Sequence, residues 1–204
     1  MPNPQNILIR GVNWLGDAIM TLPALHCLRE ANPKSKLTLL TDEKLSGLWE
    51  CSRHYDEILT FKKGESPYVV GKRLKNYSYD TALILPNSFR SALECWHGGI
   101  PQRIGYAGNW RSFLLTDAIE PRTESIPMQK RVKIDIEYRL INQLEPKTFP
   151  ANAHHIHQYL HLVKQLGASS TPMAPKFLPR QGATPYEASQ QPRPYLGIIP
   201  SAEY

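Results

Sequence analysis

An acidic residue follows the first apolar run of the chain, at the point where a helix should begin. The run Ile7–Arg10 leads into the turn Gly11-Val12-Asn13-Trp14-Leu15-Gly16-Asp17. A carboxylate beside a glycine can be approached closely, and it can accept a proton from a hydroxyl that attacks an electrophile. A carboxylate near a helix N-terminus can equally cap the helix and interact favourably with its dipole. The residues alone therefore leave Asp17 as either a general base or a capping residue.

A second polar turn follows a later apolar run. The turn Pro86-Asn87-Ser88-Phe89-Arg90-Ser91 comes directly after Thr81–Leu85. Asn87 and Ser88 offer hydrogen bonds, and an arginine such as Arg90 can bind a carboxylate or phosphate through two parallel hydrogen bonds. Asn and Ser are also common where strands end and helices are capped. Ligand binding and local capping therefore both explain this turn.

Two further arginines and the tryptophans complete the set of candidates for ligand binding. Arg103 and Arg111 are candidates for contact with an anionic substrate, and ordinary surface ion pairs are the alternative for both. Trp14 precedes Asp17 and can stack on the C–H face of a sugar. We expect Trp96 to lie in the core.

A histidine cluster near the end of the helical region raises the question of a metal. It consists of His154, His155, His157 and His161. His157 and His161 have the i, i+4 spacing that can hold zinc on a helix. Because no Glu or Cys completes a ligand set, we expect a solvated helix face, with no metal and no cofactor.

Apolar runs alternate with amphipathic segments along most of the chain, and these elements must position the candidate residues. We expect strands at residues 7–10, 36–41, 56–61, 81–85 and 103–106, and helices at 15–32, 43–51, 68–76, 88–96, 130–144 and 156–166. Residues 107–129 are rich in loops. This alternation is typical of an α/β fold, a Rossmann-like doubly wound parallel sheet. Ligands bind such sheets at the carboxyl ends of the strands, which is where both polar turns should lie.

The charge of the chain is modestly basic and unevenly distributed. The 204 residues carry a net charge of +6. Between Phe61 and Asn76 one acid, Glu65, stands among the basic residues Lys62, Lys63, Lys72, Arg73 and Lys75. This segment is either a solvated helix or a surface that attracts acidic lipid headgroups or a phosphorylated glycan. No nucleic-acid-binding motif accompanies it, so we expect no nucleic-acid partner.

The cysteines and the apolar runs indicate the cellular compartment. Cys27, Cys51 and Cys95 are odd in number and far apart, which favours reduced thiols. The N-terminus lacks the pattern of a signal peptide. No apolar run approaches the roughly 18 residues of a membrane span. We therefore expect a cytoplasmic protein, with peripheral contact with a membrane left open.

Residues 10–25 and 79–116 closely resemble the lipopolysaccharide heptosyltransferases of glycosyltransferase family 9, in particular the heptosyltransferase II type. The resemblance implies the N-terminal half of a GT-B fold. It implies inverting transfer of L-glycero-D-manno-heptose from ADP-heptose to the heptose of the lipopolysaccharide inner core. It also implies that Asp17 is the catalytic base and that the acceptor is bound by Asn13, Trp14, Gly16, Asn87, Ser88, Arg90, Arg103 and Arg111. Family members often have Lys in place of Arg90, which indicates that a cation is needed there.

The resemblance also sets the expected domain organisation. We expect an acceptor-binding domain at residues 1–167, a Pro-rich linker at 168–194 and the start of a nucleotide-sugar-binding domain at 195–204. The family is longer than this chain, so we expect a partial protein that is inactive alone. The remnant of the donor-binding loop would be Ser201, Ala202 and Glu203, although family members usually have Gly in place of Ser201.

Two alternatives to this function stay open. One is a non-catalytic module that binds core glycan or an anionic membrane surface. The other is an enzyme of the heptosyltransferase I type, which uses a different acceptor.

Overall fold

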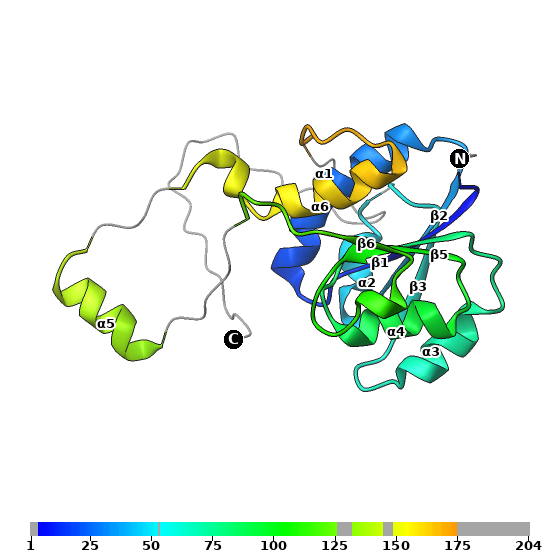
Figure 1. Cartoon of the computed structure of the whole chain (residues 1–204), viewed down its shortest axis with the longest axis horizontal. Helices are drawn as coiled ribbons and strands as arrows, with labels where there is room; N and C mark the ends of the chain where they lie inside the picture. The colour runs from blue at the N-terminus through cyan, green and yellow to red at the C-terminus, as the bar shows by residue number, and fades with distance from the viewer. Residues whose placement is uncertain (1–3, 53, 126–131, 145–148, 175–204) are drawn as a thin grey trace, which may run out of the picture.

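The computed structural model describes residues 4–52, 54–125, 132–144 and 149–174 (Figure 1). Within them, six parallel strands form one sheet in the order β3-β2-β1-β4-β5-β6. The strands are β1 (Asn6–Arg10), β2 (Lys36–Asp42), β3 (Glu57–Phe61), β4 (Thr81–Ile84), β5 (Gln102–Tyr106) and β6 (Asp117–Ile119). The predicted α/β, Rossmann-like doubly wound sheet is therefore confirmed.

The sheet contains one strand more than we predicted. β6 lies in the region 107–129, which we expected to consist of loops, so that expectation is wrong for Asp117–Ile119. The strand has only three residues, none of them buried. A segment that is so short and half exposed has no recognisable apolar periodicity.

The helices fall where the apolar periodicity placed them. They are α1 (Leu15–Ala31), α2 (Ser46–Trp49), α3 (Pro67–Leu74), α4 (Phe89–His97), α5 (Lys133–Ile141) and α6 (Ile156–Val163). Short 3₁₀ turns occupy Glu43–Leu45, Ser112–Leu114, Ala151–Ala153 and Lys164–Leu166. The last of these ends at Gly167, whose φ of 78° is a left-handed conformation that glycine adopts without strain. Among the helices, α5 has no buried residue.

Helices cover both faces of the sheet, with α1 and α6 on one face and α3 and α4 on the other (Figure 1). Alternation along β1 explains this, because successive side chains of a strand point to opposite faces. Ile7 and Ile9 pack in the cluster on the α1 and α6 face, whereas Leu8 packs in the cluster on the α3 and α4 face. A strand that is buried on both faces must be apolar throughout, as these are.

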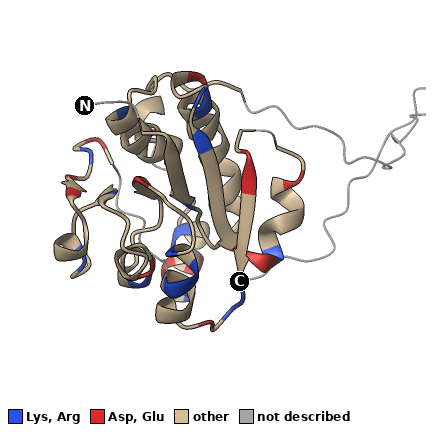
Figure 2. Cartoon of the chain, turned by 90° about the vertical axis from the view of Figure 1, so that its right-hand side faces the viewer, with Lys and Arg blue, Asp and Glu red and all other residues tan. Residues whose placement is uncertain are grey.

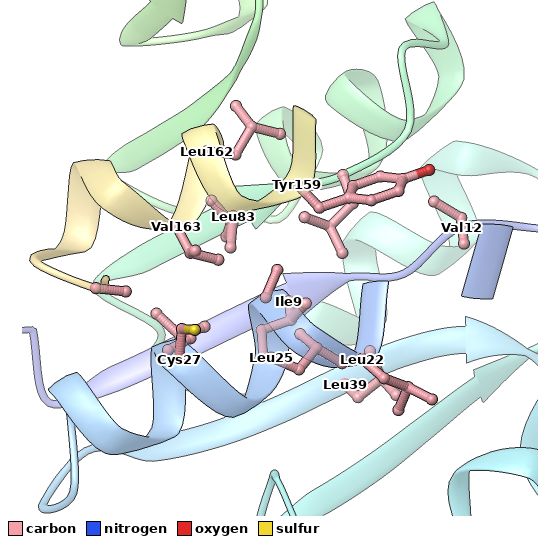
Figure 3. Packing of buried hydrophobic residues seen from close by; sticks show 14 of the residues in the cluster. Ile9, Val12, Leu22, Leu25, Cys27, Leu39, Leu83, Tyr159, Leu162 and Val163 are labelled. Atoms are coloured by element: carbon pink, nitrogen blue, oxygen red, sulfur yellow. The ribbon is translucent and has the colours of Figure 1, made fainter. Parts of the chain in front are cut away.

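The interface between α1, α6 and the sheet is the larger of the two apolar clusters. In Figure 3, Leu162 and Val163 of α6 lie over the sheet, on the same side as Leu22 and Leu25 of α1. The ring of Tyr159 extends from α6 toward Val12, which follows β1 (Figure 3). This packing brings α6, from the far end of the described chain, to the turn that contains Asp17.

The order of the strands reverses on either side of β1. The chain passes from β1 through α1 to β2, while β4 pairs with the opposite edge of β1. Ile9 is therefore aligned with Leu39 of β2 and with Leu83 of β4. In doubly wound sheets this reversal opens a crevice at the carboxyl ends of the two central strands. The two polar turns lie at these ends.

The start of the expected linker packs against the domain. Ala168 is buried, and the Sγ atom of Cys27 in α1 lies 3.4 Å from the carbonyl oxygen of Thr171. Residues 175–194 of the expected linker and the expected domain start at 195–204 lie outside the described residues, as do Ser201, Ala202 and Glu203. The domain division therefore stays a prediction. Across the described part of the chain, no helix is both long and apolar enough to span a membrane.

Candidate functional site

A pocket of about 260 Å³ lies at the carboxyl ends of β1 and β4, where the strand order reverses. Its wall is formed by the turns after these two strands, the end of β5 and the beginning of α6. The lining residues are Val12, Asn13, Trp14, Asp17, Leu85, Pro86, Asn87, Ser88, Tyr106, His155, Gln158 and Tyr159. Five residues from the predicted site therefore meet in one pocket: Asn13, Trp14, Asp17, Asn87 and Ser88.

Asp17 lies in the first turn of α1 and is half-buried in this pocket. The residue at the N-cap position is Trp14, whose side chain makes no capping hydrogen bond. Among the described residues, no donor forms a hydrogen bond with the carboxylate of Asp17. The position in the first turn is electrostatically favourable for an anion, but the carboxylate makes no capping hydrogen bond with a described residue. It is therefore available to a ligand in the pocket.

The wall opposite Asp17 comes from α6, and the sequence had indicated no ligand-binding role for it. The Nε2 atom of His155 lies 3.1 Å from the hydroxyl of Tyr159, and the two rings meet edge to face. Burial lowers the pKa of His155, while the negative charge of Asp17 acts in the opposite direction. Burial raises the pKa of Tyr159, and the charge of Asp17 adds to this effect. Burial thus favours the neutral form of both side chains, and in this form they can exchange hydrogen bonds with a polar ligand.

The expectation of a solvated histidine face is wrong for His155, which lines the pocket. A signal was available, because His155 and Tyr159 are four residues apart and share one face of α6. Another histidine, His161, lies with its Nδ1 atom 3.0 Å from the hydroxyl of Tyr106. Among the described residues, no three His, Cys, Asp or Glu side chains gather as metal ligands.

Asn13 is held by Arg10, a buried arginine for which we expected no role beyond its place in the first strand. The Nη1 atom of Arg10 donates to Oδ1 of Asn13 at 3.1 Å and also to the carbonyl oxygen of Gly11. Its Nε atom donates to Oε2 of Glu94 at 2.7 Å. The guanidinium carbon lies 4.3 Å from the centre of the Phe61 ring. Arg10 is therefore held at its Nε and Nη1 atoms beneath the first polar turn, while its buried Nη2 atom has no hydrogen-bond partner among the described residues.

Arg111 holds the second polar turn from beneath, as Arg10 holds the first. It is fully buried, and its Nε atom donates to the carbonyl oxygen of Tyr106 at 2.9 Å. Its Nη1 atom donates to the carbonyl oxygen of Pro86, and its Nη2 atom to Oδ1 of Asn87 at 3.3 Å. Burial lowers the pKa of Arg111 to about 10. We predicted a direct acceptor contact, but a side chain with no exposed surface supports the turn instead.

Ser88 caps α4, as the local interpretation of this turn proposed. Its Oγ atom accepts from the backbone nitrogen of Ser91 at 3.2 Å and donates to the Ser91 hydroxyl at 3.0 Å. The residue borders the pocket, but its hydroxyl is engaged within the helix N-terminus.

The remaining predicted cations do not reach the pocket. Arg103 lies in the strand that we expected at 103–106, and β5 begins one residue earlier, at Gln102. Arg103 is the second residue of β5, level with Ala82 near the beginning of β4, so it lies at the opposite edge of the sheet. Its guanidinium donates to the carbonyl oxygen of Leu114 at 2.7 Å and to that of Ile100. The guanidinium N–H groups of Arg103, which we expected to bind a substrate, are therefore bound to carbonyl oxygens of the protein.

Arg90 follows β4 as predicted, but its side chain turns away from the pocket. Its Nε atom donates to Oε1 of Glu94 at 2.9 Å, and its Nη2 atom donates to the carbonyl oxygen of Glu65. Within the described residues the lining of the pocket contains no Lys and no Arg. The expected cationic acceptor site is therefore not present in this pocket.

Trp14 and Gly16 leave room beside Asp17. Trp14 is 58% exposed and borders the pocket. A Cβ atom added to Gly16 would meet no atom within 4 Å, so open space adjoins the helix start. Trp96, which we expected in the core, is 48% exposed on α4, so that prediction is wrong. The indole nearest to the pocket is thus the one that the sequence favoured.

The basic segment runs from the end of β3 into α3, which packs with α4 on the face of the sheet away from α1 and α6. Arg73 is paired locally, since it donates to the carbonyl oxygen of Thr60 at 2.8 Å and lies 3.7 Å from the carboxylate of Glu65. The exposed lysines of the segment are Lys62, Lys63, Lys72 and Lys75. In Figure 2 the helices below the sheet carry blue Lys and Arg together with red Asp and Glu. The surface here is mixed in charge.

Comparison with known proteins places this fold and pocket in context. Residues 68–204 match the sequence family described as glycosyltransferase family 9 (heptosyltransferase). The lipooligosaccharide heptosyltransferase 2 of Haemophilus ducreyi is 26% identical to this chain, and the alignment covers 98% of the chain and 55% of the relative. The lipopolysaccharide heptosyltransferase 2 of Escherichia coli K12 is 27% identical, with the same coverage of 98% and 55%. The chain thus spans about half the length of these relatives.

Solved structures share the fold. The structure of E. coli ADP-heptose lps heptosyltransferase II has a TM-score of 0.63 and 23% identity, and the match covers 87% of this chain and 48% of that one. The glycosyltransferase family 9 structure from Veillonella parvula has a TM-score of 0.63 and 21% identity, and covers 85% of this chain and 44% of that one.

Proposed function

Because this chain belongs to glycosyltransferase family 9, the heptosyltransferases, we propose that it forms the acceptor-binding half of an enzyme of the heptosyltransferase II type. The donor is ADP-L-glycero-D-manno-heptose, and the acceptor is the heptose of the lipopolysaccharide inner core. The expected family and the expected fold, the N-terminal half of a GT-B glycosyltransferase, are confirmed. The observation that carries the proposal is the carboxylate of Asp17, which accepts no hydrogen bond from any described residue and lies in the pocket between the ends of β1 and β4.

Asp17 acts as the base in this proposal. The acceptor hydroxyl attacks the anomeric carbon of the donor heptose, its proton passes to the carboxylate of Asp17, and ADP leaves from the opposite face. One displacement inverts the anomeric configuration and requires a single base. A positioned base contributes roughly a hundredfold to ten-thousandfold in rate. Correct placement of the two sugars contributes further acceleration.

The acceptor sugar is held by the polar turns around Asp17. The side chains of Asn13 and Asn87 contact its hydroxyls, and Trp14 stacks on a C–H face. The open space at Gly16 admits the sugar close to the carboxylate. Arg111 supports this site from beneath, while Arg90 and Arg103 take no part in it because their guanidinium groups are bound to protein groups.

Contacts beyond the pocket are also part of the proposal. The donor is bound by a second half of the enzyme, in which Ser201, Ala202 and Glu203 would take part. We propose that the protein works in the cytoplasm, where the lysines around α3 bring it to the anionic face of the inner membrane. Nucleic acid is not a proposed partner.

A transfer assay tests the function and separates it from its alternatives. Residues 1–174 are fused to the part of the E. coli relative beyond the match, and ADP-heptose is supplied with inner-core acceptors that carry either one heptose or none. Transfer to the acceptor with one heptose supports the proposal. Transfer only to the acceptor without heptose indicates the heptosyltransferase I type. Acceptor binding without any transfer, in a fusion that binds ADP, indicates a non-catalytic module.

A further inference from the structure

Each of the two polar turns of the pocket places one asparagine above one fully buried arginine. Arg10 Nη1 donates to Asn13 Oδ1 at 3.1 Å, and Arg111 Nη2 donates to Asn87 Oδ1 at 3.3 Å. The first arrangement lies at the end of β1, and the second joins the turn after β4 to the loop after β5. Neither arrangement was predicted from the sequence.

The chemistry of the guanidinium group decides how each amide is oriented. A guanidinium carries only donors, so the amide atom that contacts it must be the oxygen. The NH₂ group of each asparagine therefore points away from its arginine. Among the described residues, no group accepts a hydrogen bond from Nδ2 of Asn13 or of Asn87. Both asparagines line the pocket, so both donors are available there.

The arginines are themselves held firmly. Arg10 is bound to Glu94 at 2.7 Å, and Arg111 donates to the carbonyl oxygens of Tyr106 and Pro86. A buried cation has few ways to satisfy its donors, and leaving one unsatisfied is unfavourable. Flipping either amide would place an NH₂ group against a guanidinium, so the donor orientation is locked.

We infer that Arg10 and Arg111 are positioning residues that fix Asn13 and Asn87 as hydrogen-bond donors, so that the pocket recognises its acceptor as a neutral polyol. This inference rests on the proposed function and names the recognised group within it. A sugar hydroxyl accepts from an amide through its oxygen and donates its proton to the carboxylate of Asp17. An anionic group would instead face that carboxylate, and the described lining offers no cation to compensate.

The first test measures binding of a neutral methyl heptoside to the 204-residue chain by NMR, which resolves the side-chain amides. We expect the Nδ2 signals of Asn13 and Asn87 to shift on titration. Asn87→Asp retains the shape and the contact with Arg111 but removes the donor, so affinity should fall at least about tenfold. Asn76→Asp, at an exposed site after α3, should bind as the wild type does. Equal affinity of Asn87→Asp and wild type would overturn the inference.

A double-mutant cycle tests whether Arg111 acts through Asn87. Arg111→Lys keeps a cation but shortens its reach, so it should weaken heptoside binding in the wild type and have little effect in the Asn87→Ala background. Equal losses in both backgrounds would show a merely structural role and contradict the inference. Inorganic phosphate serves as an anionic probe. Competition by millimolar phosphate for the same site would also contradict it.

These measurements require neither donor nor transfer. Suppose that heptoside binding depends on both asparagines but the fusion transfers no heptose. This result would reject the proposed enzymatic activity and still support recognition of a neutral sugar by Asn13 and Asn87. Absence of heptoside binding at millimolar concentration would overturn the inference itself.

Discussion

Arg10 and Glu94 form an ion pair with an Nε–Oε2 distance of 2.7 Å, and neither side chain has any exposed surface. Glu94 also accepts from Arg90 at 2.9 Å, so one carboxylate serves two guanidinium groups. The pair joins the end of β1 to α4 on the face of the sheet where α3 and α4 pack. It thereby connects the turn that contains Asn13 and Asp17 to the helix that follows the second polar turn.

Glu94→Gln should strongly destabilise the domain. The substitution leaves Arg10 buried with half of its compensation removed, and breaking a buried pair in this way typically costs about 3–5 kcal/mol. Urea unfolding followed by circular dichroism measures the change. The matched control is Glu57→Gln, which breaks the solvent-exposed pair with Lys36 at 2.8 Å and should barely change the free energy of unfolding. Similar effects of the two substitutions would show that the buried pair contributes no special stability.

Asp17→Asn should remove catalysis and leave the fold intact. In the fusion used for the transfer assay, the rate should fall by roughly a hundredfold to ten-thousandfold because the general base is lost. The amide occupies the same space, so the unfolding midpoint and the heptoside affinity should change little. A variant that folds normally and transfers heptose at nearly the wild-type rate would reject Asp17 as the base.

Gly16→Ala should separate ligand binding from stability. The added methyl group meets no atom within 4 Å, and Ala is a better helix former than Gly, so stability should stay equal or rise by up to about 1 kcal/mol. Heptoside affinity, measured by NMR titration, should fall because the methyl group fills the space next to Asp17. Unchanged affinity would show that the sugar does not approach Gly16.

Gly71→Ala is the matched comparison and should have the reverse effect. Its Cβ atom would lie 2.5 Å from Cβ of His97 and 2.8 Å from the carbonyl oxygen of Glu94, so α3 and α4 must move apart. Overpacking of this kind typically costs about 1–3 kcal/mol. Heptoside affinity of the folded protein should be retained.

Stability should fall as the pH drops below about 6.5, the ordinary pKa of histidine. Burial lowers the pKa values of His155, His157 and His161 in the folded state. The unfolded chain therefore binds more protons than the folded one in acid, and the loss of stability begins below pH 6.5 and levels off below the folded pKa values. His155→Gln should reduce the fall in thermal midpoint between pH 7 and pH 5. An unchanged fall would assign the acid sensitivity to other groups.

The positions of Asp17 and of the two polar turns followed from the sequence because they depend on local features. Two strongly apolar runs each end in small and polar residues, and parallel strands bring their carboxyl ends to one edge. The wall formed by His155 and Tyr159 depends instead on the packing of α6 against α1. The spacing of His155 and Tyr159 places them on one face of a helix, but it does not show which distant segment that face meets.

The contacts of the buried arginines could not be predicted from the sequence. Arginine is rarely buried without a partner, and Glu94, the partner of Arg10, lies 84 residues away. Arg103 was assigned to the substrate although it stood at the start of the expected strand 103–106, and the starting ends of these parallel strands lie at the edge away from the pocket. Arg111 was assigned to the substrate because its partners, apart from Oδ1 of Asn87, are backbone carbonyls, which every residue possesses.

The position of α6 in the chain has a consequence for synthesis on the ribosome. Domains begin to fold from their N-terminal side as the chain emerges. The turn that contains Asp17 appears early, but the helix that completes its pocket and covers Leu22 and Leu25 of α1 is the last one described. Nascent chains arrested before residue 150 should therefore stay sensitive to protease, and those in which residue 174 has emerged should become resistant. Until α6 emerges, the growing chain exposes an apolar face that a chaperone can recognise.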